Sequence, residues 1–197
     1  RRRAQRLLSG LRFMLSRIRP YLSFWAVCLV AIVVDVATKL LVVRHIPFGT
    51  YFASDPARPP IMIFDRLWIV HVGNKGAAWG LGAEHDVRPF LILLALAVLA
   101  LVWRWRKQLL RELQGGQLAF GLFVGGTLGN VRDRLFGDHV IDFIDVHLPF
   151  YRFPAFNVAD SCICVGVGIY IIMSYRHDRL VREAIVSHGG EDPPAGA

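Results

Sequence analysis

The sequence is poor in charged residues and in cysteine, and each shortage excludes a class of protein. Only 19% of its 197 residues are Asp, Glu, Lys or Arg, whereas 54% are hydrophobic. A soluble domain has about 25% charged residues, so the composition argues against a soluble globule and against disorder over most of the length. Three cysteines, all in apolar runs, provide neither an even disulfide set nor a zinc-site spacing.

The common motifs of hydrolytic and phosphate-binding sites are also missing. The sequence contains no HExxH pair of zinc ligands, no GxSxG nucleophile turn and no GxxxxGK phosphate loop. We therefore expect neither a metal nor a cofactor. The net charge of +8 does not indicate a nucleic-acid partner, because the basic residues are segregated into segments that flank apolar runs, which is typical of a membrane surface.

Four apolar runs dominate the chain, and we interpret each as a membrane-crossing helix. About 20 apolar residues cross a bilayer core as a helix. The first and fourth runs are long enough, the second reaches this length with its flanks, and the third is short and rich in glycine, which leaves it undecided by itself. The predicted fold class is mainly α, a bundle of four transmembrane helices at about 21–43, 87–105, 117–135 and 154–175.

Arginine and lysine placement sets the predicted orientation. The segments before the first run, between the second and third runs and after the fourth run are rich in basic residues, and basic segments stay on the cytoplasmic side. This predicts a basic cytoplasmic arm at 1–20, a membrane domain at 21–175 and a cytoplasmic, partly disordered tail at 176–197. The arm resembles the basic region of a signal peptide, but the following run is too long and too polar for one, so we expect a retained helix.

Two further patterns concern packing. The outward connection at about 44–84 is too long for a turn, and its short β-branched or aromatic runs at 61–64 and 67–70 predict a small extracytoplasmic β-domain between the first two helices. Gly121, Gly125 and Gly129 recur every four residues, which predicts a bare helix stripe on which another backbone packs closely.

The polar residues of the predicted helices gather at one depth, near the outer surface. An ionisable residue in a membrane helix is costly and is a candidate for function. Asp35 and Lys39 are four residues apart and can pair on one helix face. The others at this depth are Asn130, Asp133, Arg134, Asn157 and Asp160 at the outer ends of the third and fourth runs. Asn74, Lys75, Asp142 and Asp145 lie beside them on the two outward connections.

The carboxylates in this group provide the available chemistry. Two aspartates that share one proton supply an acid and a base together, which suffices to hydrolyse a peptide bond with water. Asp142, interpreted as a loop residue, and Asp160, at the start of the fourth helix, are 18 residues apart and can converge. Asp145 is an alternative partner, which we rank lower as a loop acid, and Asp142 itself could be a solvated loop acid.

Five short pieces, in order along most of the chain, resemble lipoprotein signal peptidase (signal peptidase II). They are Asp35-Val-Ala-Thr-Lys39, Asn74-Lys-Gly-Ala-Ala-Trp79, Gly129-Asn-Val-Arg-Asp-Arg134, Val140-Ile-Asp-Phe-Ile-Asp145 and Phe156-Asn-Val-Ala-Asp160. The resemblance implies that Asp142 and Asp160 are the catalytic pair. It places the supporting residues at Asp35, Lys39, Asn74, Gly76, Asn130, Asp133, Arg134, Asn157 and Ala159.

The resemblance also implies the activity and its setting. A family member is a multi-pass aspartic endopeptidase of the bacterial inner membrane that cuts diacylglyceryl-modified prolipoproteins just before the lipidated cysteine. The implied partners are these substrates and membrane lipids, the β-domain roofs the site near the outer face, and we expect a monomer. Two of the five pieces depart from the family pattern, with Val36 for a frequent Gln and Trp79-Gly80 for a frequent Phe-Ser, and Trp79 would alter the rim of the substrate groove.

Two other function classes remain to be weighed against this one. An ion transporter would use Asp35, Lys39 and Asp160, but its path needs polar groups through the full depth of the membrane, and the inner halves of the four runs lack them. A scaffold protein would dock a partner helix on the glycine stripe, which leaves the acidic cluster unexplained. For the neighbouring residues, we expect Asn130 or Asn157 to orient a carboxylate and Arg134 to pair with Asp133.

Overall fold

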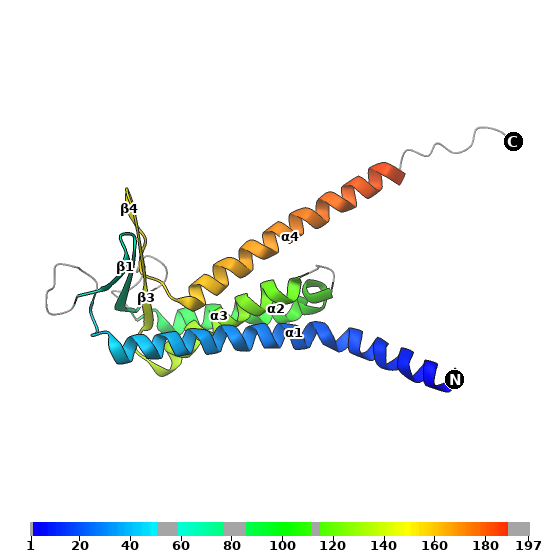
Figure 1. The fold of residues 1–197 in the computed structure, drawn as a ribbon, viewed down its shortest axis with the longest axis horizontal. Coiled ribbons are helices and arrows are strands. Elements are labelled where there is room, and N and C mark those ends of the chain that lie inside the picture. Colours follow the sequence, from blue (N-terminus) through cyan, green and yellow to red (C-terminus); the bar gives the residue numbers. More distant parts are fainter. Residues whose placement is uncertain (1, 51–58, 77–85, 112–114, 189–197) are drawn as a thin grey trace.

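The fold is a helical bundle with a small antiparallel sheet at one end, seen in a computed structural model (Figure 1). The structure describes residues 2–50, 59–76, 86–111 and 115–188, so Trp79, Gly80 and the predicted disordered end of the tail lie outside the described residues. The elements are α1 (Arg2–His45), β1 (Ile61–Phe64), β2 (Leu67–Asn74), α2 (Arg88–Arg111), α3 (Gly116–Phe136), β3 (Val140–Leu148), β4 (Tyr151–Arg152) and α4 (Val158–His188).

Within the described residues, three helical segments are long and apolar enough to cross a membrane, namely Tyr21–His45, Arg88–Gln108 and Val158–Glu183. Their large apolar side chains are widely exposed; Leu93, for example, is 66% exposed. Helix α3 is not among these segments. Its glycines and its polar last turns lower its mean hydropathy, and it buries its surface against α1 and α4 rather than presenting it outward. Length and hydropathy therefore support three of the four predicted membrane crossings, and α3 is the fourth.

Glycines on α3 set its distance from the neighbouring helices. A Cβ added at Gly125 would lie 2.7 Å from the backbone oxygen of Cys28 on α1, and one at Gly126 would collide with the backbone oxygen of Ala159 on α4. Gly121 and Gly129 likewise face Val27 and Asp35 of α1. The prediction of close packing on the stripe is thus confirmed, and the partner is another helix of the same chain.

This contact predicts a stability effect. We expect Gly125→Ala to destabilise the protein by about 1–3 kcal/mol, because the new methyl group must push α1 and α3 apart. The matched control is Gly168→Ala on α4, where an added Cβ meets nothing within 4 Å. The control should be neutral or slightly stabilising, because alanine favours helix more than glycine does. Melting of both variants in one detergent checks this, and equal melting temperatures would contradict it.

The sheet has the strand order β1-β2-β3-β4, and all its neighbours are antiparallel. The predicted hairpin of β1 and β2 is confirmed. The predicted insert between the first two helices supplies β1 and β2, but the sheet extends beyond it, because β3 and β4 come from the connection between α3 and α4. The interpretation of Asp142 as a loop residue is wrong, because the β-branched and aromatic residues of this connection pair with β2.

Asp142 and Asp145 lie three residues apart on β3, so their side chains point to opposite faces of the sheet. Asp145 is fully buried and accepts hydrogen bonds from Arg152, at 3.1 Å for the Nε–Oδ1 pair, and lies 3.0 Å from His147 Nε2. The interpretation of Asp145 as a loop acid is therefore wrong. Asp145 holds the β3–β4 hairpin together. Asp142 points to the other face of the sheet, toward the helices, and Asp145 takes no part in that face.

Candidate active site

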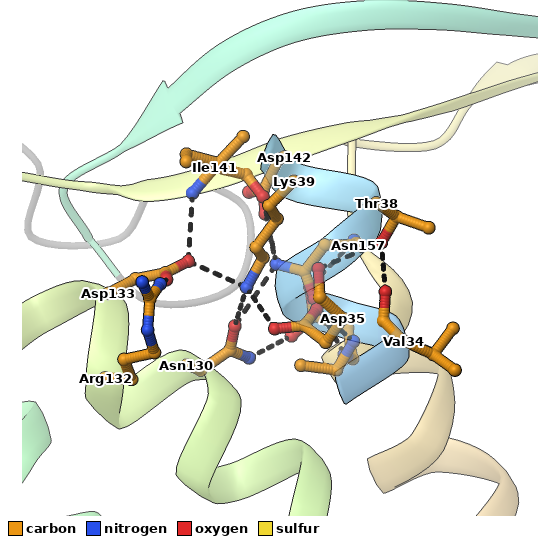
Figure 2. A network of polar contacts seen from close by, with 12 residues as sticks. Val34, Asp35, Thr38, Lys39, Asn130, Arg132, Asp133, Ile141, Asp142 and Asn157 are labelled. Carbon is orange, nitrogen blue, oxygen red and sulfur yellow. Dashed lines mark hydrogen bonds and ion pairs between the residues drawn. The ribbon is translucent and has the colours of Figure 1, made fainter. Parts of the chain in front are cut away.

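The candidate site lies where the sheet meets the bundle, at the end of the molecule away from the start of α1 and the end of α4 (Figure 1). Three helix segments contribute to it, the C-terminal part of α1, the last turns of α3 and the first turn of α4, together with β2 and β3. Figure 2 shows Lys39 reaching from α1 toward Asn130 and Asp133 of α3, below Asp142 on the strand. Segments far apart in the sequence therefore converge on one polar cluster.

Asp142 is buried, with 3% of its surface exposed, and its carboxylate is held on both oxygens. The side-chain amide of Asn157 donates to Oδ1 at 2.7 Å, and that of Asn74 donates to Oδ2 at 3.0 Å. Asn74 ends β2 and is itself positioned by a hydrogen bond from the backbone of Gly76 to its Oδ1 at 3.0 Å. The pairing of β2 with β3 thus brings an amide to the aspartate.

Asp160 is fixed by the way α4 begins. Asn157 is the N-cap of this helix, and its Oδ1 accepts a hydrogen bond from the backbone N–H of Asp160 at 2.9 Å. In return, Asp160 Oδ2 accepts one from the backbone N–H of Asn157 at 3.2 Å. This reciprocal arrangement is a capping box, which satisfies helix donors that otherwise have no partner. The carboxylate is therefore locked to the helix start.

Asn157 connects the two aspartates, because its side chain binds Asp142 while its backbone binds Asp160. Asn130 completes the connection from α3: its amide nitrogen donates to Asp160 Oδ1 at 2.7 Å, and its oxygen accepts from Asn157 at 3.2 Å. The prediction that Asn130 or Asn157 orients a carboxylate is confirmed, and both do so. Each of the four carboxylate oxygens accepts one hydrogen bond and keeps a second lone pair.

A buried charged cluster supports this network from below. The Lys39 ammonium, 1% exposed, lies 2.8 Å from Asp35 Oδ2 and 2.7 Å from Asp133 Oδ2, and it donates to Asn130 Oδ1 at 3.3 Å. The predicted pairing of Asp35 with Lys39 is confirmed. Asp35 also accepts a hydrogen bond from the backbone N–H of Ala159 at 2.9 Å, so α1 holds the start of α4 directly.

Arg134 differs from its predicted role. Asp133 pairs with Lys39 and Arg132, whereas the Arg134 guanidinium donates to the backbone oxygens of Gly76 at 3.1 Å and Asn130 at 3.3 Å. The prediction of an Arg134–Asp133 pair is wrong, because Lys39 and Arg132 contact the Asp133 carboxylate while the Arg134 guanidinium donates to two backbone oxygens. Arg134 instead ties the segment after β2 to α3.

The surroundings of Asp142 favour its protonated form. Burial, followed by the negative charge of Asp160, raises the pKa of Asp142 to about 7, although hydrogen bonds from Asn74 and Asn157 act in the opposite direction. A carboxyl group with this pKa keeps its proton close to neutral pH.

Within the described ranges, no group of three or more His, Cys, Asp or Glu side chains is placed to hold a metal ion.

All the residues predicted for the site lie in or beside this cluster. Two contributions were not predicted: Arg132, 3.2 Å from Asp133, and the backbone N–H of Ile141, which donates to Asp133 Oδ2 at 3.5 Å. Arg132 was visible as an additional basic residue in the same short piece. The Ile141 contact had no signal in the sequence, because it depends on the sheet meeting the end of α3.

The chain matches known proteins along most of its length. The family model described as signal peptidase (SPase) II matches residues 27–176. A lipoprotein signal peptidase of Aeromonas hydrophila is 39% identical over 76% of this chain and 86% of that protein. One from Halalkalibacterium halodurans is 36% identical over 81% and 96%, respectively, and one from Syntrophotalea carbinolica is 41% identical over 74% and 86%.

Solved structures share the fold. One bacterial membrane enzyme superposes with a TM-score of 0.64 at 24% identity, covering 88% of this chain and 94% of the other. A second superposes with a TM-score of 0.62 at 27% identity, covering 77% and 91%, respectively. The arrangement of helices and sheet is therefore one that membrane enzymes adopt.

Proposed function

The chain belongs to the signal peptidase II family, a family of peptidases that remove signal peptides from lipoproteins, and from this premise we propose that Asp142 and Asp160 are its catalytic pair. The observation that carries the proposal is the position of Asn157, which binds one aspartate through its side chain and the other through its backbone. Such a bridge holds two carboxyl groups next to one space, where a water molecule and a peptide carbonyl can meet.

In the proposed mechanism, Asp142 starts as the protonated acid and Asp160 as the base. Asp160 takes a proton from water, the water oxygen attacks the scissile carbonyl carbon, and Asp142 gives its proton to the carbonyl oxygen. The resulting tetrahedral diol collapses with cleavage of the C–N bond, as a proton returns to the leaving nitrogen. The assignment of roles rests on the burial of Asp142, which raises its pKa to about 7.

The proposed substrate is a diacylglyceryl-modified prolipoprotein, cut just before the lipidated cysteine. The polar cluster lies at the ends of helices whose flanks are apolar, so a peptide can enter it while its acyl chains stay among lipids. Binding energy from the acyl chains, remote from the reacting bond, would then support catalysis. The activity would need neither a metal nor a cofactor, since a water molecule and two carboxyl groups suffice.

We also propose the placement in the membrane. All four helices cross the bacterial inner membrane, α3 being enclosed by the others, and both termini are cytoplasmic. The support is that the start of α1 and the end of α4 lie away from the sheet (Figure 1) and that these helix ends belong to the basic segments of the sequence. The sheet and the aspartates then lie near the outer face, and the enzyme acts as a monomer.

The direct test is incubation of the purified protein with a diacylglyceryl-modified prolipoprotein, followed by sequencing of the new amino terminus. We expect a lipidated cysteine as the first residue, and slow or no cleavage of the same precursor without its lipid. Equal cleavage of both precursors would overturn the proposed substrate class. Cleavage at another bond would overturn the proposed position of the scissile carbonyl.

The raised pKa of Asp142 predicts the pH dependence of the reaction. The acid form of Asp142 dominates below its pKa of about 7 and is lost above it, so we expect kcat/KM to fall as the pH rises through about 7. Because the two aspartates interact, the midpoint belongs to the pair. The profile is measured from pH 5 to 9 with a lipidated precursor, and a constant kcat/KM over this range would contradict the assigned roles.

A further inference from the structure

A cavity lies away from the aspartates, between α1, α2 and α3. It has a volume of about 330 Å³, within the usual range of ligand pockets of about 300–1,000 Å³. Phe24 of α1, Val102 of α2 and Phe120 of α3 are among its lining residues, and the lining is almost wholly apolar. It forms because α2 packs mainly on α3 and touches α1 little.

The mouth of this cavity carries two tryptophans and one cation. Trp25 of α1 and Trp103 of α2 face each other with ring centroids 6.4 Å apart, and each is about half exposed. The Arg106 guanidinium lies 4.2 Å from the centroid of the Trp103 ring and donates to the backbone oxygen of Trp103 at 2.7 Å. Tryptophan is enriched where the hydrocarbon core of a membrane meets its polar headgroups, so this mouth sits at headgroup depth.

The one charged residue that lines the cavity among the described residues is basic. It is Arg106, and residues 101–108 around it contain Arg104 and Lys107 and no acidic residue. A ligand that complements this site has an extended apolar part for the cavity and an anionic group for Arg106. The aspartate cluster, by contrast, contains residues of both charge signs, and neither Trp103 nor Arg106 belongs to it.

We propose that this cavity binds an anionic glycerophospholipid of the cytoplasmic leaflet, with one acyl chain between α1 and α2 and its phosphate on Arg106. The site is distinct from the proposed catalytic pair and does not depend on it. Guanidinium groups bind phosphate oxygens through charge-assisted hydrogen bonds. A bound acyl chain fills the space that α1 and α2 leave open and thereby steadies α2 against α3.

The test is lipid binding by the purified full chain in detergent, measured by native mass spectrometry with dioleoyl phosphatidylglycerol and dioleoyl phosphatidylcholine. Ala100→Trp fills the cavity and should abolish retention of phosphatidylglycerol. Its control is Leu101→Trp, at an exposed position that does not line the cavity, which should bind as the unmodified chain does. Melting curves of both variants confirm that they are folded.

A second pair of variants tests the phosphate contact. Arg106→Gln should weaken phosphatidylglycerol binding about tenfold, as expected for the loss of one charge-assisted hydrogen bond, and leave phosphatidylcholine binding nearly unchanged. Arg104→Gln removes the same charge from an exposed position outside the cavity and should change binding less than about twofold. Equal losses in both variants would mean unspecific surface attraction and would overturn the site.

Two other results would also overturn the proposal. Retention of phosphatidylglycerol by Ala100→Trp at the level of the control would show that the lipid binds elsewhere. A raised KM for the prolipoprotein in Ala100→Trp, with lipid retention unchanged, would show that the cavity receives the signal helix of the substrate. Because binding is measured without substrate, failure of the lipid site is distinguishable from failure of the proposed peptidase chemistry.

Discussion

Replacing either Asp142 or Asp160 by asparagine should lower kcat/KM by about three orders of magnitude or more, because neither amide can share a proton with the remaining carboxyl group. The double variant should be no worse than the single variants, since the two groups act as one unit. Folding should persist. An asparagine at 142 still accepts a hydrogen bond from Asn157 and removes an ionisable group from a buried position.

The control for this experiment is Asp138→Asn. Asp138 precedes the same strand, and its side chain is 86% exposed, in contact with Arg88 at 3.2 Å. Its replacement makes the same chemical change outside the cluster and should leave cleavage within about twofold of the unmodified chain, since exposed pairs contribute little. Cleavage by Asp142→Asn at the rate of this control would show that Asp142 is not part of the catalytic pair.

The largest stability effect is expected for Lys39→Met, which should destabilise the protein by about 3–5 kcal/mol. The lysine is the only described cation within 3 Å of both Asp35 and Asp133, and their side chains are 0% and 3% exposed. Removing it leaves the buried Asp35 carboxylate without its cation and leaves Asp133 with the half-exposed Arg132 in place of a buried one. It also removes a hydrogen bond to Asn130, so cleavage by the remaining folded fraction should slow, since Asn130 orients Asp160.

Two comparisons separate this effect from a general loss of charge. Lys107→Met changes an exposed lysine on α2 and should shift the free energy of unfolding by less than about 0.5 kcal/mol. In a chain that already carries Asp35→Asn, Lys39→Met should cost less, because one of the buried charges is gone. Melting in one detergent provides all these values. A Lys39→Met variant as stable as Lys107→Met would contradict a structural role for the cluster.

Hydropathy and short motifs determined much of this protein in advance. The long apolar runs predicted helices, because about 20 consecutive apolar residues can cross a bilayer as a helix that satisfies its own backbone hydrogen bonds. The spacing of Asp35 and Lys39 predicted their pairing, since positions four apart share a helix face. The glycines of α3 predicted a close helix contact, because only a missing side chain permits such an approach.

Only the tertiary structure decided how the polar residues are used. Whether Asp142 lies on a loop or a strand depended on pairing between β2 and β3, which are separated by two helices in the chain. The partner of Asp133 was Lys39 of α1 rather than its neighbour Arg134, because helix packing, not sequence distance, determines which side chains meet. The bridge that Asn157 forms between Asp142 and Asp160 required the start of α4 to lie beneath β3, and local sequence preferences contain no information about that long-range contact.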